Sequence, residues 1–256
     1  MPTKIEWAKE VWNPIAWTGE TVFVERALAK PLRWEKPRRI FLCSMSDLWH
    51  RSVKREWVYQ IMAVVALCQG RHTIIVTTKR AKRMKSFFDQ LAGSAEPLER
   101  VARKLGYSFF YESKPVLQWP LTSLHVGISV STQDDLDKNI DYLLDTPAAV
   151  RWLSIEPMLG PIDFRQTVCS DGDHLGPTLF NHGAGEGLDW VVIGCGSGPG
   201  RRPMNIEWAY DVVRQSREAG VPVFVKQLDI GGKVARDINE FPPELQVREY
   251  PKEMNR

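Results

Sequence analysis

Short apolar runs alternate along this chain with segments of helical periodicity, and this alternation constrains the fold more than any other feature. The runs are rich in β-branched residues, which is typical of strands covered on both faces of a parallel sheet. Parallel neighbours need crossover connections, so the helices between the runs predict repeated right-handed βαβ units. The sequence therefore predicts an α/β protein with about six parallel strands, in an open doubly wound sheet or a full or partial (β/α) barrel. The predicted strands span residues 39–43, 72–77, 124–130, 150–155, 190–193 and 221–225.

Four segments with helical spacing lie between these strands, and residues typical of helix ends bound them. Ser52, Thr132 and Asn205 are the predicted N-caps, and glycines follow three of the segments, as is common at helix C-termini. The apolar residues of each segment recur on one face, which predicts that this face is buried. The predicted buried residues are Trp57, Ile61, Val64, Val65 and Cys68; Met84, Phe87, Phe88 and Leu91; Leu136, Ile140, Leu143 and Leu144; and Ile206, Ala209, Val212, Val213 and Ala219.

The composition is that of a packed globular chain. Of 256 residues, 43% are hydrophobic and 25% charged, which argues against disorder, collagen-like repeats and coiled coil. No long polar linker divides the chain, so we expect one domain over residues 1–256. No run approaches the roughly 20 apolar residues that span a bilayer, and the charged N-terminal stretch lacks the apolar core of an export signal. Four widely separated cysteines indicate reduced thiols, so we expect a cytoplasmic protein without a membrane partner.

Residues 158–188 form the one long irregular excursion that we expect. It contains Cys169, His174 and His182, and long connections of this kind tend to be functional or mobile. The spacing of these side chains matches no tight ligand pattern, so we predict no metal site there.

The net charge of +3 conceals an asymmetry. Residues 30–57 hold eight Lys/Arg against three acids and residues 70–104 hold nine against three, so these segments together carry +11 and the remainder −8. A basic half suits a phosphate-bearing partner such as DNA or RNA, with Arg38, Arg39, Lys82 and Arg83 as candidate contacts. Solvated helix faces explain the same pattern equally well.

Polar residues follow nearly every predicted strand. Because the carboxyl ends of parallel strands meet at one edge, these side chains are expected to surround one ligand site. Each has a structural alternative: Asp47 as a helix cap, Lys79 as an ion-pair partner of Glu156, Lys226 as a solvated cation. The candidates at this edge are Asp47, Lys79, Ser129, Glu156, Gly194, Gly196, Ser197, Gly198, Lys226 and Gln227.

The glycine-rich stretch 194–200 is followed by Arg201 and Arg202. Backbone N–H groups of such a loop bind anions, and guanidinium charge supports this. The stretch matches neither the Walker phosphate loop nor the dinucleotide fingerprint, so it predicts close backbone approach to an adenosine-type ligand without specifying one.

Several ordered motifs resemble phage- and prophage-encoded three-cysteine-motif proteins of the radical-SAM-like type, whose function is uncharacterised. The resemblance extends from about residue 4 to about residue 251 and is specific at the family level. The motifs are Ile5-Glu6-Trp7, Trp12-Asn13-Pro14, the stretch from Lys36 to Leu48, Thr78-Lys79-Arg80, the stretch from Leu153 to Ile162, the stretch from Ser197 to Met204, and Val225-Lys226-Gln227.

This resemblance implies a partial (β/α) barrel of the radical-SAM, TIM-like type in the cytoplasm of a phage host. In such enzymes three thiolates hold a [4Fe–4S] cluster, and S-adenosylmethionine, bound to its fourth iron, is cleaved to a radical that abstracts hydrogen from substrate. From their places at the predicted strand ends we further predict that, if the cluster loop is restored, Glu156, Ser197, Lys226 and Gln227 contact this cofactor, while Asp47 and Lys79 orient or protonate substrate.

The chain departs from the family pattern where the cluster cysteines belong. Residues Trp12 to Ile15 run directly into Ala16, and no cysteine precedes Cys43. The family's Gly-Gly-Glu-Ser-Gly is Gly194 to Gly198 here, with Cys195 and Gly196 in the middle positions, so an acid is lost. Either the protein lacks the cysteine loop, or its parent contains a loop that this sequence omits. As written, the chain is not expected to assemble a three-thiolate cluster.

Two functions follow. The first is an adenosine-ligand-binding barrel, an enzyme only if the cluster loop exists in the parent. The second is a non-catalytic nucleic-acid-binding phage protein that uses segments 30–57 and 70–104; a DNA-repair or base-modifying enzyme would combine both features.

Overall fold

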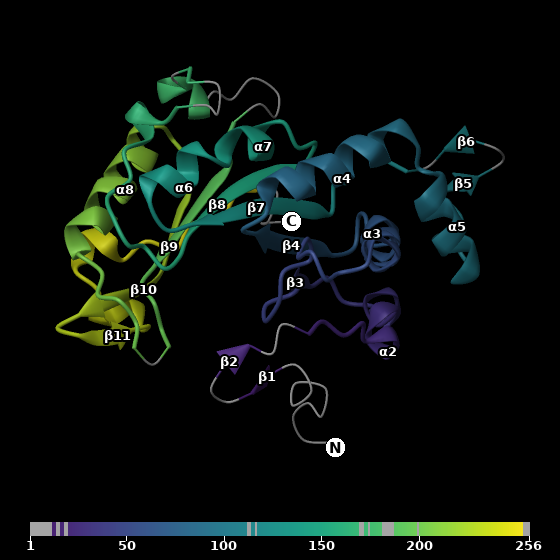
Figure 1. Cartoon of the computed structure of the whole chain (residues 1–256), viewed down its shortest axis with the longest axis horizontal. Helices are drawn as coiled ribbons and strands as arrows, with labels where there is room; N and C mark the ends of the chain where they lie inside the picture. Colours follow the sequence, from purple (N-terminus) through teal and green to yellow (C-terminus); the bar gives the residue numbers. More distant parts are fainter. Residues whose placement is uncertain are drawn as a thin grey trace.

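A curled seven-stranded sheet is the centre of the fold in the computed structural model (Figure 1). The structure describes residues 12–13, 16–17, 20–111, 114–115, 117–168, 172–173, 175–180, 187–198 and 200–252. The sheet order is β11-β10-β9-β8-β7-β4-β3. Its strands are β3 (Arg39–Phe41), β4 (Thr73–Thr78), β7 (Leu124–Val130), β8 (Val150–Ile155), β9 (Trp190–Gly194), β10 (Val223–Ile230) and β11 (Lys233–Ala235).

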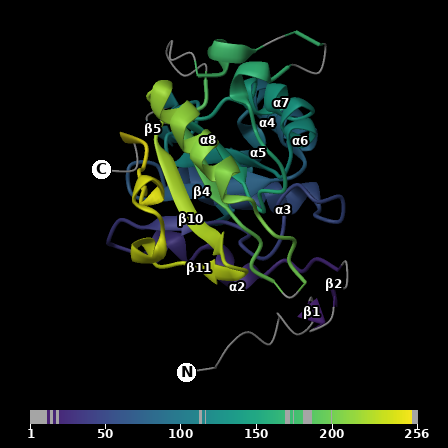
Figure 2. The same ribbon diagram turned by 90° about the vertical axis from the view of Figure 1, so that its left-hand side faces the viewer.

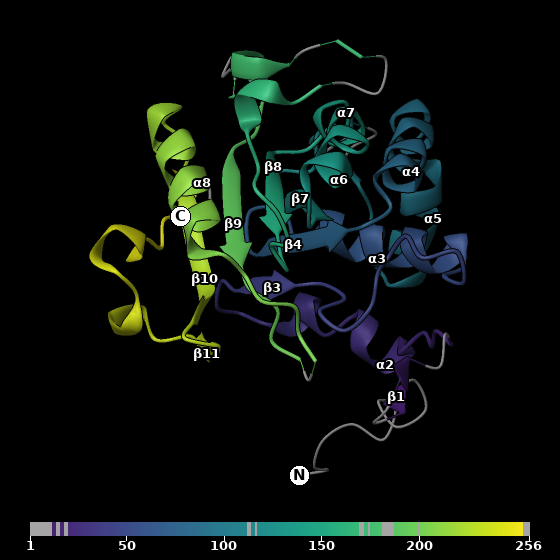
Figure 3. The same cartoon turned by 60° about the vertical axis from the view of Figure 1, so that its left-hand side comes forward.

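The strands from β3 to β10 pair in parallel and lie side by side in chain order, while β11 pairs antiparallel with β10. A doubly wound sheet contains a point where the strand order reverses, and this sheet has none. Right-handed crossovers between successive neighbours place their helices on a single face. The predicted α/β class is confirmed, and the sheet has the form of a half-barrel (Figure 3).

The helices and short elements complete the chain. Two small hairpins, β1 (Trp12–Asn13) with β2 (Ala16–Trp17) and β5 (Phe110–Tyr111) with β6 (Lys114–Pro115), lie outside the main sheet. The α-helices are α2 (Glu25–Leu28), α3 (Arg55–Leu67), α4 (Ala81–Gly93), α5 (Glu96–Lys104), α6 (Gln133–Asp137), α7 (Ile140–Leu144) and α8 (Ile206–Glu218), and the 3₁₀ turns are η1 (Pro31–Arg33), η2 (Phe164–Gln166), η3 (Gly176–Phe180), η4 (Ile238–Glu240) and η5 (Pro243–Leu245).

Two of the predicted helix caps are confirmed and one is wrong. The Thr132 side chain accepts from the N–H of Asp135, and the Asn205 side chain accepts from the N–H of Glu207. Helix α3 instead begins at Arg55, without a side-chain cap, and the hydroxyl of Ser52 lies 2.6 Å from Nδ1 of His50. The helix expected after Thr132 divides into α6 and α7.

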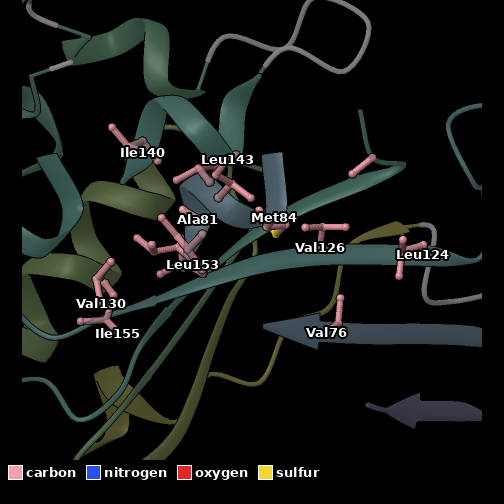
Figure 4. Packing of buried hydrophobic residues seen from close by; sticks show 14 of the residues in the cluster. Val76, Ala81, Met84, Leu124, Val126, Val130, Ile140, Leu143, Leu153 and Ile155 are labelled. Atoms are coloured by element: carbon pink, nitrogen blue, oxygen red, sulfur yellow. The ribbon is translucent and has the colours of Figure 1, made fainter. Parts of the chain in front are cut away.

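The convex face of the sheet carries the main core. Alternate residues of a strand point to opposite faces, and on this face they pack against α3, α4, α6, α7 and α8. Figure 4 shows the contact with α4 and α7, and Figure 2 shows α8 lying along β10. The residues labelled in the close-up are Val76, Leu124, Val126, Val130, Leu153 and Ile155 from strands, with Ala81, Met84, Ile140 and Leu143 from helices.

The concave face carries a second, aromatic cluster. It contains Ile75, Trp152, Trp190 and Val192, and Phe224 and Tyr250 pack against it. None of these described residues comes from a helix, so strand side chains and one later segment line this face.

The two ends of the half-barrel meet at the amino ends of the strands. The segment after η5 pairs along β10, where Val225 N–H donates to Val247 and Glu249 N–H donates to Val223. Beyond it, the ring of Tyr250 lies 4.7 Å below the guanidinium carbon of Arg39, on β3 at the opposite edge of the sheet. This contact joins the β3 and β10 sides at the amino ends of the strands, whereas the polar residues described below lie at the mouth of the concave face, toward the carboxyl ends.

The excursion at residues 158–188 contains η2 and η3. Cys169, His174, His182 and Gly183 lie outside the described residues, as does part of the predicted motif around Trp12. Within the described ranges, no group of three or more Cys, His, Asp or Glu is arranged to hold a metal, and no helix is long and apolar enough to cross a membrane.

Candidate functional site at the carboxyl ends of the strands

Four of the predicted site residues come together where β8 and β9 end, beside the middle of β10; we call Glu156, Gly194, Lys226 and Gln227 the rim cluster. Lys226 and Gln227 were expected to follow the last strand, but β10 continues to Ile230, so they lie within it. Nζ of Lys226 donates to both carboxylate oxygens of Glu156, at 2.8 and 3.0 Å. Nε2 of Gln227 lies 3.5 Å from Oε1 of the same carboxylate. The structural alternative that Lys79 pairs with Glu156 is wrong, because Lys226 is the cation bound to Glu156.

An irregularity in β10 brings two consecutive side chains to Glu156. Neighbouring residues of a regular strand point to opposite faces, so Lys226 and Gln227 would not both reach one carboxylate. The pairing of β10 with β9 shifts between Val225 and Gln227, as in a β-bulge, and bulges re-aim side chains. The buried Gln227 amide is further fixed by donating to the Cys195 carbonyl at 2.6 Å.

Gly194 is required by the space around it. A Cβ at this position would lie 3.3 Å from Cγ of Gln227 and 3.4 Å from the Glu156 carboxyl group. Neither neighbour can give way freely, because both take part in the hydrogen bonds above. The side chains of Lys226 and Glu156 are 53% and 20% exposed, so the ion pair remains accessible to a ligand.

The glycine-rich loop continues from the rim cluster. Ser197 and Gly198 are exposed, and a Cβ on Gly196 would lie 3.2 Å from Cβ of Arg201. Arg201 donates to Asp229 at 3.3 Å and to the Gly232 carbonyl. The sequence drew attention to Arg201 but not to Asp229, whose only signal was its position two residues beyond Gln227 on the same strand.

Ser129 lies next to the rim cluster without touching its carboxylate. Its hydroxyl is 3.3 Å from the backbone carbonyl of Glu156, to which it donates. Ser129 therefore supports the backbone at the end of β8.

Asp47 and Lys79 lie apart from the rim cluster, at the end of β4. Asp47 accepts from the backbone N–H groups of Trp49 and Lys79, at 2.9 and 3.1 Å. It also accepts from the Thr78 hydroxyl and the Arg80 guanidinium, both at 2.7 Å. These four donors occupy the carboxylate and hold the β4–α4 turn, and β7 separates this turn from β8.

The four basic candidates divide between the two ends of β4. Arg38 and Arg39 lie where β3 begins, beside Thr73, whereas Lys82 and Arg83 lie in the first turn of α4 after Thr78. At roughly 3.3 Å per residue, the length of β4 separates them by about 17 Å. Arg38 covers the ring of Trp34 at 4.7 Å, and Arg83 donates to the Val53 carbonyl.

The three described cysteines do not fit a [4Fe–4S] cluster. Cys43 follows β3, Cys68 caps α3 and Cys195 follows β9, so they belong to separate places in the fold, and all three are free thiols. Burial raises the pKa of each, that of Cys68 to about 11, which disfavours the thiolate that iron requires.

Comparison with known protein families gives a match over most of the chain. The model of a family described as "Protein of unknown function (DUF5131)" covers residues 15–252. No curated protein and no solved structure matches the chain.

Proposed function

The chain belongs to the DUF5131 family, and from the geometry of the rim cluster we propose that it binds an adenosine-containing ligand, S-adenosylmethionine, in a barrel of the radical-SAM, TIM-like type. The observation that carries the proposal is the solvent-accessible Glu156–Lys226 pair at the mouth of the concave face. In (β/α) architectures this end of the sheet is where ligands bind.

The chemistry of the rim cluster complements such a ligand. The Lys226 ammonium suits its carboxylate, and the Glu156 carboxylate suits its amino group or ribose hydroxyls. The exposed backbone around Ser197 and Gly198 allows close approach by a ring or an anion.

The proposal is limited to binding. Reductive cleavage of S-adenosylmethionine requires an iron–sulfur cluster, and the described cysteines do not fit one. An iron–sulfur enzyme would need further thiolates beyond Cys43, Cys68 and Cys195.

Calorimetric titration of S-adenosylmethionine tests the proposal. We expect saturable heat with the unaltered protein and at least about tenfold weaker binding by Glu156→Gln, because a charge-assisted contact is lost. Glu218→Gln is the matched control, since Glu218 pairs with Arg214 on the exposed side of α8 and should leave affinity unchanged. Absence of binding by the unaltered protein, or equal affinity of Glu156→Gln, would refute it.

Nucleic-acid binding through the basic segments is the weaker candidate, because its four residues do not share one end of the sheet. It requires affinity for DNA or RNA that falls steeply with salt. Fluorescence anisotropy of labelled DNA and RNA at about 50 mM salt tests it. Charge reversal at Arg38, Arg39, Lys82 and Arg83 should weaken binding, and absence of binding by the unaltered protein would refute this candidate.

A further inference from the structure

Among the residues that the structure describes, three buried polar atoms on the concave face have no hydrogen-bond partner. They are the Thr77 hydroxyl oxygen, Nδ1 of His125 and Nε1 of Trp152. His125 is 1% exposed and Trp152 is 3% exposed, so bulk water does not reach these two groups freely. Buried polar groups in folded proteins are nearly always paired, and exceptions call for a physical reason.

The sheet register places these three groups together. Thr77 on β4 lies beside Gly127 on β7, which lies beside Trp152 on β8. His125 precedes Gly127 by two residues and shares its face of the sheet. A Cβ on Gly127 would lie 2.6 Å from Nε1 of Trp152, so the indole crosses over β7 toward Thr77. We call Thr77, His125 and Trp152 the floor triad.

Aromatic rings surround the floor triad, and the face remains open on one side. The rings of Trp152 and Trp190 are 5.4 Å apart, and Phe41 meets Trp152 edge-on at 6.2 Å. Phe41 is 46% exposed, so the β3 side of the concave face borders solvent.

We propose that the floor triad is a binding site for the polar edge of an uncharged planar heterocycle of the nucleobase class. The indole N–H only donates, the threonine hydroxyl donates and accepts, and the imidazole nitrogen does one or the other. A heterocycle edge that carries adjacent donors and acceptors satisfies all three, and its ring faces pack on the aromatic wall.

The charge state of the floor agrees with a neutral occupant. Burial lowers the pKa of His125 to about 4, so its imidazole is uncharged at neutral pH. The triad contains no carboxylate or ammonium group. The site is also separate from the rim cluster, because Glu156 lies four residue steps beyond Trp152, a span of about 13 Å. The inference therefore goes beyond the proposed adenosine-ligand site and does not depend on it.

Two matched pairs of variants test whether the triad atoms lack partners in the free protein. Thr77→Val and Thr78→Val make the same change at adjacent residues, but the Thr78 hydroxyl donates to Asp47. Trp152→Phe and Trp190→Phe make the same change on neighbouring strands, but the Trp190 indole donates to the Glu249 carbonyl at 3.0 Å. We expect each triad variant to retain a higher Tm than its partner variant, because no bond is lost. Equal losses of Tm within both pairs would mean that ordered water already satisfies the triad, and would overturn the inference.

Binding is tested with the free bases adenine, cytosine and uracil, by saturation-transfer NMR and titration calorimetry. We expect saturable binding of at least one base by the unaltered protein, and at least about tenfold weaker binding by Thr77→Val and by Trp152→Phe. Thr78→Val should retain the affinity of the unaltered protein. Glu156→Gln should also retain it, which separates this site from the rim cluster. Absence of binding of all three bases at millimolar concentration, or binding that survives both triad variants, would overturn the inference.

Discussion

Gly127 determines where the indole of Trp152 can lie. A Cβ at this position would come within 2.4 Å of the buried ring, so Gly127→Ala forces the indole or the strand to move. We expect the free energy of unfolding to fall by about 1–3 kcal/mol, as for other overpacked cores, measured by urea denaturation. Gly93→Ala is the control, because a Cβ there meets nothing within 4 Å at the end of α4, and it should be neutral or slightly stabilising. Equal free energies of unfolding for Gly127→Ala and Gly93→Ala would show that the Trp152 ring does not limit the space at Gly127.

His125 gives the fold a dependence on pH. Its pKa is lowered from the ordinary 6.5 to about 4 by burial, so the unfolded chain binds more protons than the folded one between these values. The contribution of the uncharged His125 to the free energy of unfolding is therefore fully present above pH 6.5, and it is lost as the pH falls toward 4. We expect the free energy of unfolding to drop by about 2 kcal/mol between pH 7 and pH 5, and His125→Gln to flatten this dependence. An unchanged slope in that variant would assign the effect to other groups.

The residues of the site were only partly predictable. Glu156, Gly194, Lys226 and Gln227 were found because the carboxyl ends of parallel strands share an edge, which the order of apolar runs already indicates. The same rule wrongly selected Asp47, because it picks out any polar residue near a strand end. The Asp47 carboxylate is already bound by donors of the neighbouring turn and is not part of the rim cluster. The floor triad carried no signal, because the sequence does not show which face of a strand becomes the concave one or which strands lie side by side.

At the scale of elements, the start of α8 depends on a single side chain. Asn205 accepts from the N–H of Glu207, one of the N–H groups that a helix start leaves unpaired. We expect Asn205→Ala to lower the free energy of unfolding by about 1 kcal/mol, while Asn205→Asp retains the cap and most of the stability. Urea denaturation of both variants is the measurement, and equal losses would show that the amide does not act as a cap.

Element positions followed from periodicity where the pattern was long. The predicted bounds of β7 and β8 agree with the structure, because their apolar runs are uninterrupted. Strand β11 was missed, since Lys233–Ala235 is too short and too polar to show a pattern. Ser52 was misassigned because its hydroxyl bonds locally instead of capping, which a sequence does not reveal.

At the scale of the whole molecule, the contact between Arg39 and Tyr250 joins the two sides of the half-barrel. We expect Tyr250→Leu to lower the free energy of unfolding, and a double-mutant cycle with Arg39→Met to give a coupling of about 0.5–1 kcal/mol, because a partly exposed cation–π pair is lost. Hydrogen exchange of β3 should accelerate in both single variants. Strictly additive effects would show that the two side chains are neighbours without interacting.

The order of the strands in the sheet could not be predicted from the sequence alone. A doubly wound sheet and a barrel contain the same alternation of strands and helices, and they differ only in which strand lies beside which. That choice depends on the long-range pairing of β3 with β4 and of β10 with β9, which local apolar patterns do not encode.

The chain order of the strands also bears on how the polypeptide matures. Each parallel strand from β4 to β10 docks beside the one synthesised before it, so a nascent chain can extend the sheet stepwise as it leaves the ribosome. Tyr250 is separated from Arg39 by almost the entire sequence, and such a distant contact has to wait for everything between them. The Arg39–Tyr250 contact can therefore form only after all the strands from β3 to β10 have been synthesised.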